Sequence, residues 1–189
     1  MDDGSTGSGA RSDVALPVRT GSAHGTDWTL RAASAADIEV IAELRATVMR
    51  ADLERLGRYD EHRVRQRLRD SFSTRHTSII LIDREPVGCE LVGREPVDRE
   101  LVGCVTVRPS EDGQGGQWLE HFYLAPHCQG RGLGSAVLRT VLERTDARGV
   151  AVSLNVLRGS AARRLYERHG FVVAAQDPID VFMVRPPRA

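Results

Sequence analysis

The stretch from Leu119 to Leu138 constrains the fold of this chain more than any other, because a strand, a glycine-rich turn and a helix follow one another directly. The apolar run Phe122–Leu124 is typical of a buried strand, and Pro126 ends it because proline cannot donate to a sheet ladder. Alternate glycines within residues 130–134 then allow a tight turn and a close approach of the backbone to a ligand. Apolar residues at helical spacing follow from Leu133 onwards.

This order exposes unpaired backbone N–H groups at the positive end of a helix dipole, an anion site that most often binds phosphate. A Walker A loop is excluded because it requires a lysine, and all 26 basic residues of the chain are arginine. The same composition excludes an internal Schiff base to pyridoxal phosphate. The dinucleotide fingerprint G-x-G-x-x-G fits poorly, since its third glycine, counted from Gly130, would be Ser135.

Two motifs together indicate which phosphate ligand the turn suits. Residues Gln129–Gly134 read Q-G-R-G-L-G and match Q/R-x-x-G-x-G/A, the pyrophosphate-binding loop of acyl-coenzyme A N-acetyltransferases. Further along, Ser160–Phe171 resembles the second signature of those enzymes, an Asn-led helix that carries L-Y-E-x-x-G-F. With both motifs present in the right order, the chain resembles the GNAT superfamily.

The resemblance implies an α/β fold with a mixed sheet, in the order β-α-α-β-β-β-α-β-α-β-β over roughly residues 28–185. It implies an enzyme that moves an acetyl group from acetyl-CoA, its co-substrate, to a primary amine by direct attack on the thioester, without a metal. It also implies that the backbone of Phe122, Tyr123 and Leu124 pairs with the pantetheine arm. The slot for that arm would open where the fourth and fifth strands splay apart.

The residues expected to hold the pyrophosphate surround the start of the helix, whose dipole favours that group by roughly 0.3–1 kcal/mol. Arg131 can add a guanidinium that grips phosphate oxygens. Ser160 stands where the family has an asparagine; serine can cap a helix and donate to the cofactor, with a shorter reach. The remaining loop residues expected to contact the cofactor are Gln129, Gly130, Gly132, Leu133, Gly134 and Ser135.

Two residues are the catalytic candidates. Tyr166 matches the tyrosine that protonates or hydrogen-bonds the CoA sulfur in the family; the alternative is a core aromatic packed beside Phe171. Glu120 is expected to be the general base, on the same face of its strand as Phe122 by period-two alternation. The competing interpretation of Glu120 is a partly buried charge held by an arginine. His121 is expected to point to the opposite face and to be structural.

Composition limits the other classes of function. Hydrophobic residues make up 41% of the chain and charged residues 28%, which is ordinary for a soluble globular protein. The formal net charge is zero, so nothing favours nucleic acid or an anionic membrane as a partner. The N-terminus lacks the features of a signal peptide, and three cysteines without C-x-x-C spacing indicate neither a disulfide framework nor a zinc site. A cytoplasmic protein is the default expectation.

The length of 189 residues is typical of one domain. Residues 1–26 are rich in small polar residues and are predicted to be a disordered tail, followed by an acetyltransferase domain over 27–189. Ser34 and Asp37 form a variant of the capping box at the first helix. Strands are predicted at 28–32, 77–82, 101–108, 118–124, 150–157, 171–174 and 181–184, and helices at about 37–56, 60–72, 133–146 and 160–169.

Four tandem pentapeptides of pattern x-E-[P/L]-V-[G/D] occupy residues 84–103. A period of five matches neither a helix nor a strand. Removing three copies would leave a continuous hairpin sequence, so the repeat is predicted to be an insertion in the hairpin between the second and third strands of the GNAT order.

Several alternatives stay open at the level of sequence. The main one is a GNAT domain that binds or senses acyl-CoA with weak or lost catalysis. Among enzymes, the acceptor is either a small-molecule amine or an amine of a protein or peptide. The oligomeric state is either monomer or homodimer.

Overall fold

The computed structural model describes residues 18–23, 25–83, 99–111 and 115–188 of the chain. Within these residues, eight strands form one mixed sheet that four helices cover, and none of these helices is long and apolar enough to cross a membrane. The strands are β1 (Arg19–Ala23), β2 (Thr26–Ala32), β3 (Thr77–Asp83), β4 (Arg99–Pro109), β5 (Gln117–Leu124), β6 (Val152–Leu157), β7 (Val172–Gln176) and β8 (Asp180–Arg185). The helices are α1 (Ile38–Arg55), α2 (Glu61–Ser71), α3 (Leu133–Ala147) and α4 (Ala162–Arg168), with 3-10 turns η1 (Ala35–Asp37) and η2 (Pro126–Cys128).

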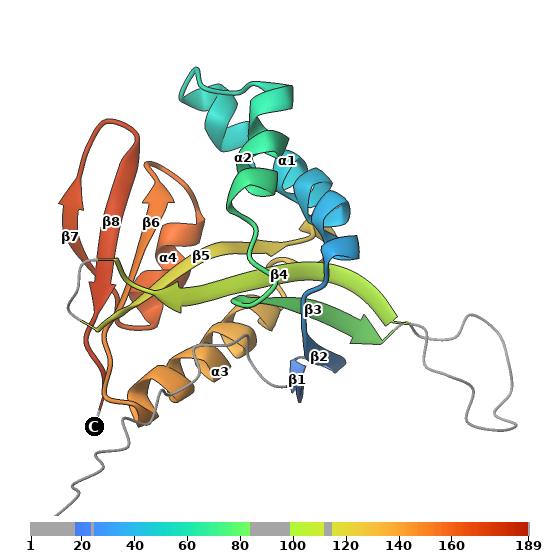
Figure 1. Cartoon of the computed structure of the whole chain (residues 1–189). Helices are drawn as coiled ribbons and strands as arrows, with labels where there is room; N and C mark the ends of the chain where they lie inside the picture. Colours follow the sequence, from blue (N-terminus) through green and yellow to red (C-terminus); the bar gives the residue numbers. More distant parts are fainter. Residues whose placement is uncertain (1–17, 24, 84–98, 112–114, 189) are drawn as a thin grey trace, which may run out of the picture.

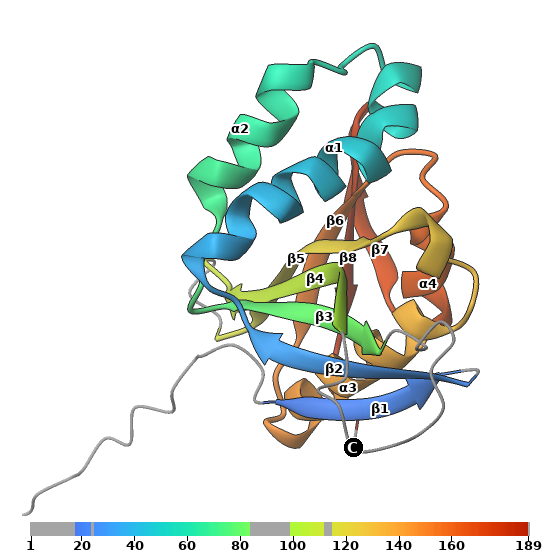
Figure 2. The same cartoon turned by 90° about the vertical axis from the view of Figure 1, so that its right-hand side faces the viewer.

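The sheet separates two layers of helices. Its strand order is β1-β2-β3-β4-β5-β6-β8-β7, and only the β5–β6 pair among the described strands is parallel. Helices α1 and α2 lie over one face, and α3 crosses the other (Figures 1 and 2). The larger core cluster contains the α3 stripe Val137, Leu138 and Val141 together with Tyr166 of α4. A smaller cluster beneath α1 and α2 includes Ile41 and other residues of helices and sheet.

From β2 onwards, the order of elements confirms the α/β mixed-sheet prediction and the order β-α-α-β-β-β-α-β-α-β-β. One strand was not predicted. Residues Arg19–Ala23 form β1, which pairs antiparallel with β2, so the prediction of a disordered tail up to residue 26 is wrong for this part. Residues 1–17 lie outside the described residues.

The strand β1 escaped prediction because its sequence, R-T-G-S-A, has no apolar alternation. It is an edge strand, and its hydrogen bonds to β2 supply the stability that side-chain burial does not. Gly21 also fits closely over Trp28, whose ring atoms lie 2.6 Å from where a Cβ of residue 21 would stand. The indole of Trp28 is buried, so the small residues of β1 act as its cover.

The capping box predicted at the first helix is confirmed. The backbone N–H of Ser34 donates to Asp37 Oδ2 at 2.7 Å, and Arg31 holds the same buried carboxylate with two hydrogen bonds of 2.9 and 2.7 Å. The bonds from Arg31 lower the pKa of Asp37 to about 2 despite burial. This group fixes the start of α1 to the end of β2.

The arginines of α2 are paired with the neighbouring helix. Arg65 contacts Glu43 at 2.6 Å, and Arg69 contacts Glu39 at 2.7 Å. These pairs balance the charge of the arginines on this side of α2. They also hold α2 in register along α1.

An ion pair joins the far end of α3 to β8. Arg185 is only 3% exposed and donates to both oxygens of Asp146 at 2.6 and 2.7 Å. Its Nε donates to the backbone carbonyl of His169 at 3.0 Å. Because every donor edge of the buried guanidinium finds an oxygen, the charge is compensated.

The strands β3 and β4 form the predicted hairpin. Their last register pair is Asp83 with Arg99. Residues Arg99–Gly103, the fourth pentapeptide, form the start of β4, so the predicted insertion is wrong for this copy: its backbone pairs with β3 and Val102 is fully buried. The first three copies, residues 84–98, lie outside the described residues.

We predict that replacing residues 84–98 with Asn-Gly will leave a folded protein. Asn-Gly closes a two-residue hairpin, and Asp83 and Arg99 already face each other. The shorter loop should reduce the closure cost by about 1–2 kcal/mol, so the thermal unfolding midpoint should stay the same or rise. A Gly/Ser segment of the original length is the matched control for loop length. Loss of a cooperative melt in the Asn-Gly variant would contradict the hairpin interpretation.

Candidate functional site

The parallel strands β5 and β6 stay together for only two residue pairs. Gln117 pairs with Val152 and Trp118 with Ser153; beyond this point β6 continues along β8 and β5 along β4. Figure 1 shows β6 turning away from β5. Among the described residues, the later part of β5 therefore has one edge of backbone N–H and C=O groups without a partner strand, which an extended polar ligand can use.

A β-bulge bends β5 where this free edge begins. Tyr123 faces Cys104 and Glu120 faces Thr106, so two residues of β5, His121 and Phe122, oppose one residue of β4. His121 has a φ of 48°, a left-handed conformation that few residues other than glycine adopt. Bulges and strained residues of this kind gather next to functional sites.

The bulge overturns the predicted facing of Glu120 and His121. Because Thr106 and Cys104 lie on the same side of β4, Glu120 and Tyr123 lie on the α1–α2 face of the sheet. Phe122 and Leu124 pack on the opposite face, against the α3 core. Glu120 therefore does not share a face with Phe122 or Leu124 as period-two alternation predicted.

His121 lies on the same face as Glu120, against the prediction that it would point the opposite way. Its ring nitrogens lie 3.3 Å from Ser71 Oγ and 3.5 Å from Thr106 Oγ1. The imidazole also stacks on the Tyr123 ring, with centroids 6.0 Å apart. An extra residue in the strand shifts the alternation by one, and nothing local in the sequence marks where this happens.

The glycine-rich loop has the backbone geometry of an anion site. Gly130 and Gly132 have φ angles of 73° and 78°, which turn the chain so that α3 begins at Leu133. The first helical hydrogen bond is from Ala136 N–H to Gly132 O at 3.0 Å. In the described part of the chain, the N–H groups of residues 130–135 have no backbone acceptor, as expected at a helix N-terminus.

Two contacts fix the loop to the open end of β5. The side-chain amide of Gln129 donates a hydrogen bond from Nε2 to Leu124 O at 2.8 Å. A Cβ at Gly134 would stand 3.2 Å from Leu124 and 3.6 Å from Leu165 of α4, so glycine allows these three elements to meet. The loop, the free strand edge and α4 therefore converge at one place.

Tyr166 is buried at this convergence. It is 6% exposed and meets Phe171 edge to face, with centroids 5.7 Å apart. Burial raises the pKa of its phenol, so it stays protonated through the neutral range. Among the described residues, no hydrogen bond to its hydroxyl is found. The structure thus shows the core packing beside Phe171 that the alternative interpretation of Tyr166 required.

Glu120 is held by Arg108. The Arg108 Nε donates to Glu120 Oε1 at 2.9 Å, and the glutamate side chain is 19% exposed. Arg108 also contacts the exposed Glu111 at 2.8 Å. The structure thus shows the interaction that the competing interpretation of Glu120 required, beside the bulge.

The remaining residues predicted to contact the cofactor differ in their exposure and position. Arg131 is exposed at the tip of the loop and Ser135 is half-buried in the first turn of α3. Ser160 lies before α4, and its Oγ accepts a long hydrogen bond of 3.4 Å from Ala162 N–H. Helix α4 thus begins at Ala162, two residues later than predicted.

Arg45 also belongs to this site, and it was not predicted from the sequence. Arg45 reaches from α1 to the hydroxyl of Tyr123, with its guanidinium 5.7 Å from the ring centroid. It lies in a helix far from both motifs, so no local signal distinguished it from the other arginines.

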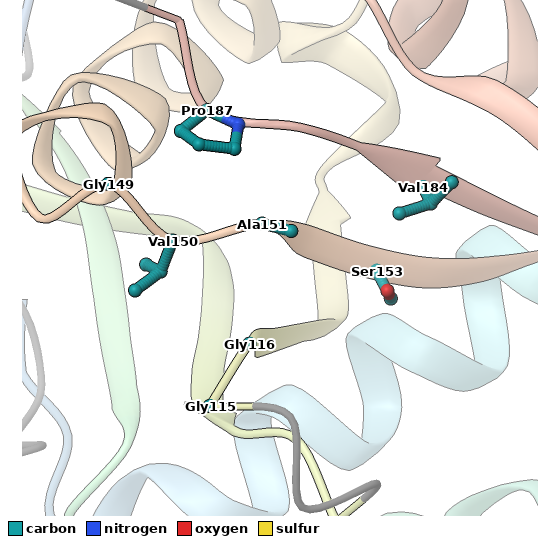
Figure 3. A pocket seen from close by; sticks show the side chains of 8 residues that line it. All are labelled: Gly115, Gly116, Gly149, Val150, Ala151, Ser153, Val184 and Pro187. Carbon is teal, nitrogen blue, oxygen red and sulfur yellow. The ribbon is translucent and has the colours of Figure 1, made fainter.

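A hollow at the opposite end of the parallel pair does not coincide with the predicted site (Figure 3). It lies where β5 and β6 begin, and residues from the two strand starts and the C-terminal segment line it. Figure 3 shows glycines and small apolar side chains with Ser153. Among the described residues, no group of three or more His, Cys, Asp or Glu could hold a metal ion, and the buried Cys104 and Cys128 are free thiols.

We predict that His121→Asn reduces the acid sensitivity of the fold. Burial lowers the pKa of His121 from 6.5 to about 4, with smaller effects from Glu120, Arg45 and Arg108. Its folded pKa lies below its unfolded value, so its stability contribution is present above about pH 6.5 and is lost as the pH falls towards 4. The loss is at most about 3 kcal/mol.

Asparagine tolerates the left-handed backbone of residue 121 but does not titrate. Urea unfolding at several pH values between 7.5 and 4.5 should show a smaller loss of unfolding free energy in His121→Asn than in the wild type. Parallel stability curves for the two proteins would show that residue 121 does not titrate as a buried group.

Comparison with known proteins agrees with this geometry. A family model described as "Acetyltransferase (GNAT) domain" matches residues 79–173, half of the chain. This segment runs from β3 to β7 and contains the bulge, the loop and Tyr166. A search of curated proteins found no match.

Solved structures show the same fold at low sequence identity. The PaiA N-acetyltransferase of Thermoplasma acidophilum, in complex with coenzyme A, has a TM-score of 0.60 at 17% identity, over 84% of this chain and 98% of that one. The ribosomal-protein-S18-alanine N-acetyltransferase of Escherichia coli has a TM-score of 0.55 at 17% identity, over 86% and 96% of the two chains. By its family match and its fold, the chain belongs to the GNAT acetyltransferase family.

Proposed function

We propose that the protein transfers an acetyl group from acetyl-CoA to a primary amine by direct attack of the amine on the thioester. The observation that carries the proposal is the unpaired edge of β5, which runs from the bulge to the free N–H groups of residues 130–135. An extended arm with a pyrophosphate at one end and a thioester at the other fits this arrangement. A structural relative is known in complex with coenzyme A, which supports the assignment of the ligand.

The chain offers separate groups for the two ends of the cofactor. The backbone N–H groups of residues 130–135, which have no backbone acceptor among the described residues, would bind the pyrophosphate at the positive end of α3, with Arg131 adding a charged contact. Backbone groups of Phe122–Leu124 would pair with the pantetheine arm. Ser160 could contribute a hydroxyl from the segment before α4.

In the proposed reaction, the neutral amine nitrogen forms a bond to the thioester carbonyl carbon, and the carbon–sulfur bond then breaks. Glu120 would take the proton that the amine loses, directly or through water. Tyr166 would give a proton or a hydrogen bond to the departing thiolate. One observation supports Glu120: it lies beside the bulge on the α1–α2 face of the sheet, opposite the helix layer against which Phe122 and Leu124 pack.

The proposed catalytic domain is larger than the sequence boundaries suggested. We propose that it begins with β1 at Arg19, because β1 completes the sheet and covers Trp28. It extends through β8.

The alternative is a GNAT domain that binds acyl-CoA without transferring the acyl group. Release of free thiol from acetyl-CoA with a panel of primary amines, alongside calorimetric binding of acetyl-CoA, separates the two. Amine-dependent thiol release supports the transferase. Tight binding with no release above the background rate would support the sensor.

We predict that Tyr166→Phe lowers turnover by about 10²-fold or more, the usual size of general-acid effects. The ring and its contact with Phe171 are kept, and in the described part of the chain the hydroxyl has no hydrogen-bond partner to lose. Binding of acetyl-CoA and the melting temperature should therefore change little. Unchanged turnover at saturating acetyl-CoA would exclude Tyr166 from the reaction.

We predict that Glu120→Gln abolishes the acidic limb of the pH–rate profile and slows transfer by about 10²-fold or more. In the wild type, Arg108 Nε contacts Glu120 Oε1 at 2.9 Å. Glutamine keeps the size of the side chain, and its amide oxygen can still accept a hydrogen bond from Arg108. His121→Asn is the matched control on the neighbouring residue of the bulge. If the limb persists in Glu120→Gln and disappears in His121→Asn, the base is the histidine.

A further inference from the structure

Arg45 has an unusual setting for an arginine of this protein. It lies on α1 and is half-buried, between the helix and the end of β5. Its Nη1 donates to the hydroxyl of Tyr123, and its guanidinium lies 5.7 Å from the centre of that ring. Both contacts are to a neutral side chain.

Four other arginines of α1 and α2 have carboxylate partners, in the pairs Arg50–Glu54, Arg55–Asp52, Arg65–Glu43 and Arg69–Glu39. Arg45 has none within ion-pair distance among the described residues. Its charge is thus less compensated than the charges of Arg50 and Arg55, which are exposed, although a half-buried cation needs a counter-charge more.

The Nε atom of Arg45 also indicates that protein groups compensate this side chain incompletely. It is fully buried and, within the described part of the chain, makes no hydrogen bond. Buried N–H groups without a partner are rare, because each loses its bonds to water and gains nothing in return. Among the described residues, the Nε of this half-buried guanidinium thus has no protein partner, and a planar guanidinium with unused donors suits a carboxylate.

The location of Arg45 indicates which molecule would supply the missing anion. Tyr123 lies after the bulge, on the free stretch of β5 and close enough to Tyr166 for the two phenols to interact electrostatically. Arg45 reaches this point from α1, whereas Leu133, at the end of the loop before α3, packs in the core cluster of the opposite helix layer. The pyrophosphate of the cofactor would bind at that loop, so the anion that pairs with Arg45 must come from a different ligand.

We propose that Arg45 binds a carboxylate of the acceptor, so that the preferred acceptors are amines that also carry a carboxylate. This inference rests on the proposed transferase function and names its substrate class. Two sources have the same chemistry, a free amino acid and the C-terminal residue of a short peptide. A planar guanidinium fixed against Tyr123 would orient the acceptor as well as attract it.

The test compares acceptors in matched pairs. Free α-amino acids of different side-chain type are assayed against their primary amides, and short peptides with a free C-terminus against C-terminal amides. We expect the carboxylate member of a pair to have the higher kcat/KM, by about tenfold or more, as charged hydrogen bonds typically contribute. The more reactive series, amino acids or peptides, identifies the source of the carboxylate.

Three variants make the assignment to Arg45 specific. Arg45→Gln should raise KM for the carboxylate acceptors by about tenfold or more and leave their amides and the KM for acetyl-CoA nearly unchanged. Arg45→Lys, which keeps the charge without the planar fork, should recover part of the preference and guards against a simple folding defect. Arg50→Gln is the control on the same helix, since Arg50 is exposed and contacts Glu54 and Tyr59.

The inference is overturned if amides are used as well as carboxylates, or if Arg45→Gln affects both members of a pair equally. If no amine is acetylated although acetyl-CoA binds, the proposed transferase function fails instead. The carboxylate site is then tested by binding alone. N-acetylated amino acids, in the presence of CoA, should raise the melting temperature of the wild type and not of Arg45→Gln, and equal shifts in both proteins would refute the site.

Discussion

The separation of β5 from β6 is the constraint on which the rest of the site depends. Parallel strands normally pair along their length, but here only Gln117 and Trp118 do so. The bulge at His121 bends β5, and the close packing of Gly134 against Leu124 and Leu165 fills the space behind it. The protein therefore leaves one polar strand edge free without exposing a large apolar surface, because the apolar side chains of β5 remain covered on both faces.

The two helix layers divide the chemistry between them. The layer of α3 and α4 carries the unpaired amides and Tyr166, which suit the polyanionic cofactor and its sulfur. The layer of α1 and α2 carries Arg45 and covers the face on which the bulge places Glu120 and His121. In the proposed reaction, cofactor and acceptor would approach from opposite sides of the sheet and meet at the end of β5.

Local features could be predicted from the sequence, and features set by tertiary contacts could not. The loop from Gln129 to Gly134 and the order of elements depend on glycines, caps and periodicity, which are visible in short windows. The bulge depends on the pairing of β5 with a strand earlier in the chain, so alternation assigned Glu120 and His121 to the wrong faces. Arg45 shows the same limit, since only the packing of α1 on β5 distinguishes it from other arginines. The edge strand β1 was missed because its stability comes from backbone pairing and from one tryptophan in the next strand.

The ion pair of Asp146 and Arg185 lies where the two parts of the sheet are joined. The sheet consists of two leaves, β1–β5 and β6–β8–β7, which the β5–β6 hydrogen bonds join only at one end. Arg185 stands opposite Val152 at that end, and its bonds to Asp146 attach the second leaf to α3. The ion pair therefore anchors β8, and with it the second leaf, to α3 beside the place where the two leaves of the sheet are joined.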